Sequence, residues 1–246
     1  MRGAYLILGA TSAIARATAR ELARQGYHLT LAGRDMDELQ RDAADIRLRF
    51  SVEVEVKPFD AEDFAGHAAF LNGVVDDGGE LDGVVLAFGY LGEQTRASQE
   101  FAESLAIIQR NYTGAISILN LCAEYLAARG RGTMIAISSV AGDRGRQSNY
   151  IYGSAKGGLT IYLEGLRNAM FHRGVHVMTV KPGFVDTAMT YGLSGMFLVA
   201  TPQAVARRIL KARDKGVNTL YAPWFWRWIM LIIRHVPETI FKRLKM

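Results

Sequence analysis

Short apolar runs alternate with amphipathic stretches along most of the chain. Most of the apolar runs lack a polar side, which is typical of strands that are buried on both faces of a parallel sheet. We expect strands at Ala4–Leu8, His28–Ala32, Val52–Pro58, Gly83–Ala87, Thr133–Ile137, Val175–Val180 and Thr219–Ala222. The amphipathic stretches predict helices at Ile14–Gln25, Asp37–Phe50, Asp63–Val75, Ser154–His172 and Pro202–Lys215, with further helix between Ser98 and Leu126.

This alternation of strand and helix predicts an α/β domain of the Rossmann type, a doubly wound parallel sheet with helices on both faces. We expect the domain to occupy residues 1–222 and a hydrophobic, basic, amphipathic helical tail to occupy residues 223–246. Ligands of such sheets bind beyond the carboxyl ends of the strands. Residues that directly follow a predicted strand are therefore the first candidates for chemistry.

Composition and charge narrow the classes of partner. The chain has 246 residues and a single cysteine, Cys122, which excludes a disulfide framework and a multi-cysteine metal site. No His, Asp or Glu cluster has metal-ligand spacing either, so we expect no metal. The net charge of +5 is uneven, because residues 201–246 hold ten Lys or Arg and two Asp or Glu. This distribution argues against nucleic acid as a partner and favours an anionic lipid surface or a phosphate.

The tail is the unusual part of the chain. It contains all three tryptophans, Trp224, Trp226 and Trp228, next to lysines and arginines, which suits a helix lying in a membrane interface. An oligomer interface or a lid over the pocket is the alternative. The apolar stretch Tyr5–Ala10 is too short for a signal peptide. We expect a cytoplasmic protein in peripheral contact with the inner face of the plasma membrane.

The loop after the first strand fits the pyrophosphate of a dinucleotide. Small residues there let main-chain N–H groups approach the phosphates, and the N-terminus of the following helix faces the negative charge. The candidate residues are Gly9, Thr11, Ser12, Ala13 and Ile14. Alanine stands at two places where glycine is usual, so an ordinary strand-to-helix turn is the alternative interpretation.

Residues after the next strands extend this cofactor site. An acidic residue after the second strand would bind the ribose 2′-hydroxyl of NAD, whereas an arginine accommodates the 2′-phosphate of NADP. Arg34 at this place favours NADP(H), with NAD(H) or a solvated surface arginine as the alternatives. Asp60 follows the third strand and is a candidate acceptor for the adenine amino group. Ala87, Phe88 and Gly89 end the fourth strand, where glycine lets the chain pass close to a cofactor.

Four residues form a candidate catalytic set: Ser139, Tyr152, Lys156 and Asn111. Tyr152 and Lys156 are four residues apart, so their side chains share one face if a helix opens at Tyr152. A carbonyl that receives hydride needs a proton, and a lysine ammonium near a tyrosine lowers the pKa of its hydroxyl. A serine hydroxyl stabilises charge that develops on the substrate oxygen, and Asn111 can hold a water that relays protons to Lys156.

In their order and spacing these residues resemble the short-chain dehydrogenase/reductase family over its whole catalytic domain. The resemblance implies that Tyr152 donates the proton, that Lys156 also binds the ribose hydroxyls of NADP(H), and that Ser139 positions the substrate. It implies a loop around the nicotinamide after the sixth strand, with the candidate residues Pro182, Gly183, Val185 and Thr187.

Within that family the chain most resembles the decaprenylphosphoryl-2-keto-ribose reductases. The stretches 87–92, 111–113 and 138–142 carry this resemblance, and the ending from Tyr221 to Phe241 is its most specific part. It implies reduction of a 2-keto-pentose on a polyprenyl phosphate for cell-envelope arabinan, with the ketone supplied by a partner oxidase.

Other partners and functions stay open. We expect a homo-oligomer. Arg144 and Arg146, near the candidate site, are either surface charges or contacts for a substrate phosphate. One alternative function is a reductase of a soluble ketone or steroid-like compound whose tail serves oligomerisation. The other is a non-catalytic NADP(H) sensor or scaffold.

Overall fold

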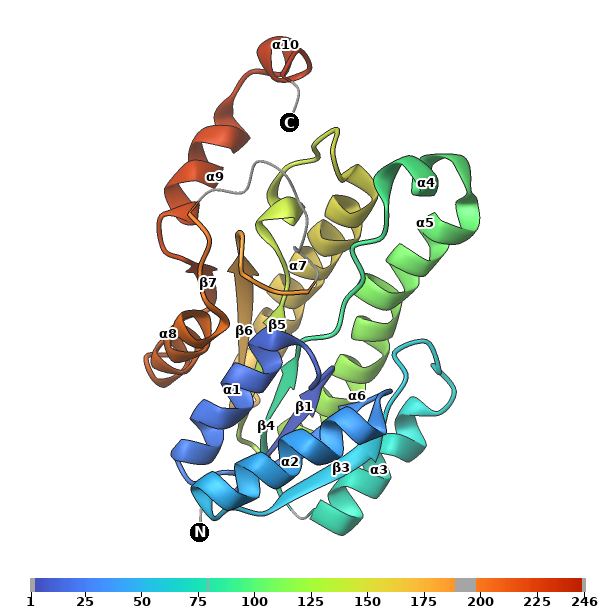
Figure 1. Ribbon diagram of the computed structural model, residues 1–246. Coiled ribbons are helices and arrows are strands. Elements are labelled where there is room, and N and C mark those ends of the chain that lie inside the picture. The colour runs from blue at the N-terminus through green and yellow to red at the C-terminus, as the bar shows by residue number, and fades with distance from the viewer. Residues whose placement is uncertain (1–2, 79, 189–197, 245–246) are drawn as a thin grey trace.

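The computed structural model describes residues 3–78, 80–188 and 198–244. A parallel sheet of seven strands in the order β3-β2-β1-β4-β5-β6-β7 forms its centre (Figure 1). The strands are β1 (Ala4–Leu8), β2 (His28–Gly33), β3 (Val54–Pro58), β4 (Leu81–Leu86), β5 (Gly132–Ile137), β6 (Val175–Pro182) and β7 (Thr219–Ala222). The strand order reverses at β1 and β4, and a ligand crevice opens at the carboxyl ends of the strands at such a switch point. The predicted doubly wound sheet is confirmed.

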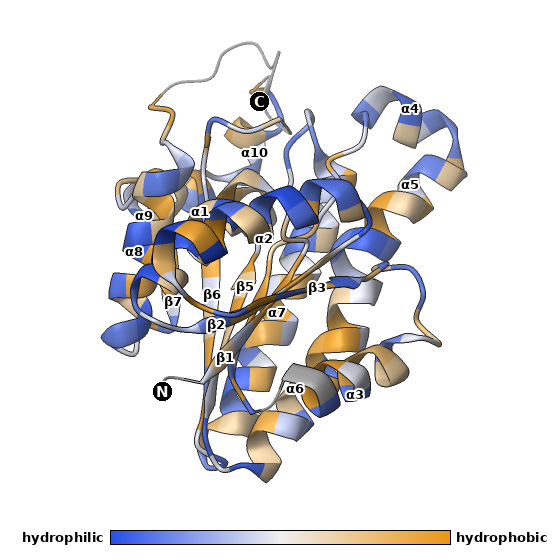
Figure 2. Cartoon of the chain, turned by 60° about the horizontal axis from the view of Figure 1, so that its bottom comes forward, coloured by the Kyte–Doolittle hydropathy of each residue, from blue (hydrophilic) through white to orange (hydrophobic). Residues whose placement is uncertain are grey.

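Alternate residues of β1 serve the two faces of the sheet. Tyr5 and Ile7 belong to one hydrophobic cluster, and Leu6 and Leu8 belong to the other. The first cluster includes residues of helices α1 (Ala13–Arg24), α2 (Met36–Phe50) and α8 (Pro202–Asp214). The second includes residues of α3 (His67–Gly78), α6 (Gly114–Ala128) and α7 (Tyr150–Phe171). Figure 2 shows largely apolar strands between these helices and polar residues along α1 and α2.

Two predicted helix starts were wrong, and local side-chain bonds explain both. Helix α7 begins at Tyr150, before the predicted start at Ser154. The Ser154 hydroxyl does not cap the helix, because it donates to the carbonyl of Ile151 (2.7 Å) one turn earlier. Helix α3 begins later than the predicted Asp63, because the Asp63 carboxylate accepts from the N–H of Gly66 (3.1 Å) and closes a turn.

The segment expected to be helical between Ser98 and Leu126 is broken into several pieces. It consists of α4 (Gln94–Gln99), α5 (Phe101–Ile108), a π-helical turn (Gln109–Thr113) and α6. The carboxylate of Glu93 begins α4 by accepting from the N–H groups of Thr95 and Arg96 (2.8 and 2.7 Å). π-Helical turns are frequent at functional sites, and this one contains the buried Asn111.

The chain after β7 forms α9 (Trp226–His235) and α10 (Glu238–Phe241). Figure 1 shows both helices beyond the carboxyl ends of the strands. Trp226 and Met230 of α9 are buried with Val140, which lies in a short 3-10 helix, η2 (Val140–Asp143). Within the described ranges, no helix is both long and apolar enough to cross a membrane.

Candidate active site

The turn between β1 and α1 requires glycine at its first position. Gly9 has a φ of +77°, and a Cβ there would lie 2.6 Å from the main-chain nitrogen of Phe88. The hydroxyl of Ser12 caps α1 by accepting from the N–H of Ala15 (3.2 Å). The first turn of a helix carries N–H groups that lack an intrahelical acceptor. The turn therefore brings main-chain donors and the positive end of the α1 dipole to the cavity beside it.

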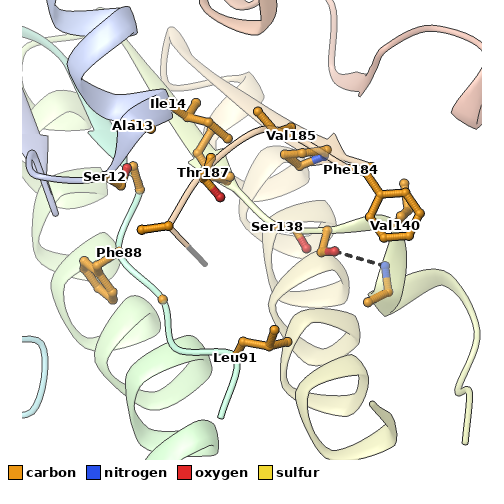
Figure 3. A pocket seen from close by; sticks show the side chains of 18 of the residues that line it. Ser12, Ala13, Ile14, Phe88, Leu91, Ser138, Val140, Phe184, Val185 and Thr187 are labelled. Carbon is orange, nitrogen blue, oxygen red and sulfur yellow. Dashed lines mark hydrogen bonds between the residues drawn. The ribbon is translucent and has the colours of Figure 1, made fainter. Parts of the chain in front are cut away.

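Two cavities lie along the carboxyl ends of the strands and share Thr11, Ser12, Ala87, Phe88 and Gly89. The smaller one, about 270 Å³, contains Gly9, Arg34 and Asp60 in its wall. The larger one, about 620 Å³, is lined by the other predicted cofactor residues except Lys156 and by part of the catalytic set: Ala13, Ile14, Ser139, Tyr152, Pro182, Gly183, Val185 and Thr187. Figure 3 shows Ser12, Ile14 and Phe88 on one side of this cavity and Ser138 and Val140 on the other.

These features fit a nicotinamide dinucleotide, whose elongated shape matches two connected cavities. The helix N-terminus lies between them, where a pyrophosphate would be held. Gly9 provides a close main-chain approach that a side chain would fill. Arg34 is exposed at the wall of the smaller cavity. Asp60 also lines that cavity, and its carboxylate already accepts from the N–H of Glu62 (2.9 Å).

Tyr152 and Lys156 lie on the buried side of α7, with 8% and 3% of their surface exposed. The ammonium nitrogen of Lys156 is 5.9 Å from the centre of the Tyr152 ring. Burial raises the pKa of Tyr152 to about 12, and a hydrogen bond with Ser139 opposes this rise. Burial lowers the pKa of Lys156 to about 8. Tyr152 is therefore protonated at neutral pH, as a proton donor must be, although we had expected its pKa to be lowered.

Ser139 lies at the start of η2, directly after β5. Its hydroxyl oxygen accepts from the N–H of Ala141 (3.1 Å). This bond fixes the side chain on the cavity wall and leaves the hydroxyl proton available for an acceptor. The neighbouring Ser138 has a structural role, because its hydroxyl donates to the carbonyl of Lys156 (3.0 Å) behind the site.

Asn111 and Lys156 lie behind the cavity wall and meet at Gly89. A Cβ at Gly89 would be 2.8 Å from Oδ1 of Asn111 and 3.3 Å from Nζ of Lys156. Lys156 donates to the carbonyl of Ile137 (3.1 Å), and Asn111 donates to the carbonyl of Ile107 (2.8 Å). The structure thus brings the two groups expected to hold a relay water together beside Gly89, where Oδ1 of Asn111 also accepts from the N–H of Tyr90 (3.2 Å).

The comparisons with known proteins agree with this geometry. A family model described as short chain dehydrogenase matches residues 4–195. The chain belongs to the short chain dehydrogenase family. This short chain dehydrogenase is an NAD(P)-dependent oxidoreductase, and the Rossmann-type fold and the enzyme class predicted from the sequence are confirmed.

Relatives of this dehydrogenase cover nearly all of its length. An uncharacterized oxidoreductase of Mycobacterium tuberculosis is 36% identical, over 97% of this chain and 96% of its own. Another uncharacterized oxidoreductase, from Streptomyces coelicolor, is 39% identical, over 97% of this chain and 94% of its own. Among solved structures, a short-chain dehydrogenase from Sphingobium yanoikuyae in complex with NADPH is similar in fold, with a TM-score of 0.84, 22% identity and coverage of 96% and 97%.

Trp226 is a cavity residue that sequence reasoning missed. It is 2% exposed, lines the larger cavity and packs edge-on against Phe184, with 5.5 Å between ring centres. A Cβ at Gly183 would overlap its indole, at 1.9 Å from Nε1, so glycine is needed at this place in the dehydrogenase. The cluster of tryptophans in the tail was the available signal, but it did not indicate which of them faces inward.

The two arginines near the site have different surroundings. Arg144 reaches the tail: it donates to the carbonyls of Ile233 and Val236 (2.6 Å each) and forms an ion pair with Glu238 (2.9 Å). The hypothesis that Arg144 is a substrate contact is therefore wrong, because its donors are used by the end of α9. Arg146 instead lines the larger cavity, which agrees with the second of the two interpretations given for it, and Asn149, which sequence reasoning missed, lines the same cavity.

Proposed function

We propose that this dehydrogenase uses NADPH to reduce the 2-keto group of a polyprenylphosphoryl pentose. One observation carries the proposal: α9 contributes Trp226 to the larger cavity and at the same time exposes Trp228, Leu231 and Ile232 on its outer side. A substrate with a polar sugar and a long apolar chain needs both environments next to each other. A soluble ketone would need only the cavity.

The residues of the candidate site have distinct roles in this proposal. When bound, the cofactor supplies the hydride. Tyr152 gives its proton to the carbonyl oxygen, and Ser139 donates a hydrogen bond to the same oxygen. Lys156, with a pKa lowered to about 8, stabilises the phenolate left on Tyr152 and binds the ribose hydroxyls. Asn111 orients a water that returns a proton towards Lys156.

The cofactor preference in this proposal is NADPH over NADH. Arg34 supports it, because a guanidinium beside the smaller cavity can pair with the 2′-phosphate of NADPH. The uncharged 2′-hydroxyl of NADH would leave the charge of the guanidinium without a counter-charge. The solved structure from Sphingobium yanoikuyae and that of an actinorhodin polyketide ketoreductase each contain NADPH. Pro182, Val185 and Thr187 are proposed to contact the nicotinamide end, since they line the larger cavity next to Tyr152.

The tail is proposed as a unit that holds the enzyme at the inner face of the plasma membrane. Residues 1–222 form the catalytic domain in this proposal, and residues 223–246 form the membrane contact. The exposed apolar side chains of α9 are flanked by Arg227 and Arg234, which complement anionic lipid headgroups. A partner oxidase acting on the same lipid would supply the ketone.

A homo-oligomer is also part of the proposal. Ile161 and Phe171 are exposed on α7, at 71% and 73%, and they offer apolar contact area to a second copy of the chain. Sedimentation at several concentrations tests this assembly separately from activity.

The deciding experiment measures the loss of NADPH absorbance in mild detergent, with a prenylphosphoryl 2-keto-ribose as the substrate and NADH in parallel. We expect oxidation of NADPH well above the rate without substrate, and slower oxidation of NADH. A protein that binds NADPH but turns over only soluble ketones would contradict the proposed substrate and leave the enzyme class intact.

A further inference from the structure

A single turn presents two polar side chains to the larger cavity. The N–H of Asn149 donates to the carbonyl of Arg146 (3.1 Å), which closes this turn just before α7. Both residues line the cavity that contains Tyr152 and Trp226. The two residues therefore line the same cavity as the proposed proton donor, whereas Arg34 lines the smaller cavity.

Both side chains have buried atoms without a hydrogen-bond partner among the described residues. These atoms are Nε of Arg146 and Oδ1 of Asn149. Buried polar atoms are almost always paired in folded proteins, and an unpaired one costs free energy. Two such atoms on one turn in the wall of a cavity indicate a place where a ligand supplies the missing partners.

No carboxylate near Arg146 is available to it in the described part of the chain. Asp143 is closest in sequence, but it accepts from the ammonium of Lys181 (2.6 Å) and from the hydroxyl of Tyr221 (2.7 Å). Glu38 is the one acidic residue among the described lining residues, and it forms an ion pair with Arg16. Asp143 attracts the guanidinium of Arg146 only at a distance, because burial still lowers the pKa of Arg146 overall, and no carboxylate among the described residues forms an ion pair with it.

We infer that Arg146 binds an anionic group of the carbonyl substrate and that Asn149 binds a neighbouring hydroxyl. The planar guanidinium suits a phosphate, with which it forms paired, charge-assisted hydrogen bonds. The amide of Asn149 suits a sugar hydroxyl, which both donates and accepts. This inference rests on the proposed function and deepens it: the phosphate and a hydroxyl of a prenylphosphoryl keto-pentose are the groups recognised.

The test compares binding of farnesyl phosphate and farnesol to the NADP⁺-loaded enzyme, followed by tryptophan fluorescence because Trp226 lines the cavity. We expect Arg146→Gln to lower the affinity for farnesyl phosphate about 10- to 100-fold, the usual effect of losing a charge-assisted hydrogen bond. The affinity of the Arg146→Gln variant for farnesol should stay within about twofold of that of the wild type. Arg146→Lys should fall between the wild type and the glutamine variant, because it keeps the charge and loses the planar geometry.

Arg208→Gln is the matched control. Nε of Arg208 is also buried without a partner in the described residues, but Arg208 lies on α8 and lines neither cavity. Equal losses for farnesyl phosphate and farnesol in Arg146→Gln, or no binding of farnesyl phosphate by the wild type, would overturn the inference. Failure of the proposed function would be seen in a different measurement, as the absence of turnover of prenylphosphoryl 2-keto-ribose. Ribose 5-phosphate that binds as tightly as the lipid, with the same dependence on Arg146, would support the anion site and overturn the lipid substrate.

Discussion

Arg144 donates a 2.6 Å hydrogen bond to the main-chain oxygen of Ile233, and so joins the loop after Ser139 to the C-terminal helix. The same guanidinium covers the ring of Phe241, with 3.7 Å between its carbon and the ring centre. The last turn of a helix carries carbonyls without an intrahelical donor, and Arg144 satisfies them at α9. The active-site loop and the tail therefore share one anchor.

We expect Arg144→Ala to loosen the tail and lower the free energy of unfolding by about 1–3 kcal/mol, because several charge-assisted hydrogen bonds are lost together. Limited proteolysis after β7 and thermal unfolding measure the two effects. Glu238→Gln is the control, since its carboxylate is exposed and surface ion pairs contribute little. Equal protease sensitivity in the two variants would contradict the anchor.

Tyr152→Phe should lower kcat by a factor of about 10² to 10⁴, the usual contribution of a positioned proton donor, with little change in NADPH binding. Tyr150→Phe is the matched control, because Tyr150 lies on the same helix but is exposed. Steady-state kinetics together with a titration of NADPH separate the two effects. Full activity of Tyr152→Phe would refute the proposed proton transfer.

The activity should fall as the pH rises through about 8, where Lys156 loses its proton and no longer stabilises a phenolate at Tyr152. Tyr152 itself stays protonated over this range, because its pKa is about 12. A pH profile of kcat/KM for the wild type and Lys156→Arg tests this assignment. The arginine variant keeps its charge, so the decline near pH 8 should be absent from its profile whatever its absolute rate.

The same pKa shift predicts a change in stability. Lys156 has a pKa of 10.5 before and about 8 after burial, so between these values the unfolded chain binds more protons than the folded one. The contribution of this group to the free energy of unfolding therefore rises with pH across that window and is flat below pH 8. Denaturant unfolding of the wild type and Lys156→Met measures the difference, which should disappear in the variant.

Arg34→Glu should reverse the cofactor preference. A carboxylate repels the 2′-phosphate of NADPH and accepts from the 2′-hydroxyl of NADH, so we expect KM for NADPH to rise about 10- to 100-fold. Arg41→Glu, on the exposed side of α2, makes the same charge change away from both cavities. An unchanged ratio of the two KM values in Arg34→Glu would mean that Arg34 is a solvated surface residue.

Replacing Ile232 on the outer side of α9 should weaken binding to vesicles that contain phosphatidylglycerol. Burial of an isoleucine side chain contributes about 1.5–3 kcal/mol, so Ile232→Ser should lower the affinity about tenfold or more. Leu48→Ser is the control, since Leu48 is an exposed apolar residue of α2, away from both the tail and the apolar face of α7. Equal effects of the two substitutions in a flotation assay would count against the tail as the membrane contact.

The sequence predicted the sheet well because buried parallel strands carry apolar residues on both faces, as β1 and β4 do. It also predicted many of the residues that follow the strands and line the two cavities, since strand ends in a doubly wound sheet meet at one edge. Helix starts were harder, because the hydroxyl of Ser154 bonds within the helix and the carboxylate of Asp63 closes a turn. Local sequence does not distinguish those uses from a cap.

The surroundings of Arg144, Arg146 and Trp226 could not be predicted for a different reason. Each depends on contacts between segments far apart in the chain, such as the 2.6 Å bond from Arg144 to Val236. The two arginines are separated by one residue, but Arg144 binds the tail and Arg146 lines the larger cavity. Periodicity shows that the tail is apolar, but only the packing against Gly183 and Phe184 selects Trp226 as the inward residue.

Trp226 also determines when the active site is completed during synthesis. The β1 loop, Ser139 and Tyr152 leave the ribosome early enough for the central strands to pair, since domains fold as the chain emerges. The wall of the larger cavity nevertheless remains open beside Gly183 until α9 has emerged, because the indole that packs there belongs to α9, which follows all seven strands in the chain. Nascent chains halted before Trp226 would thus hold the reacting residues without the wall that encloses them.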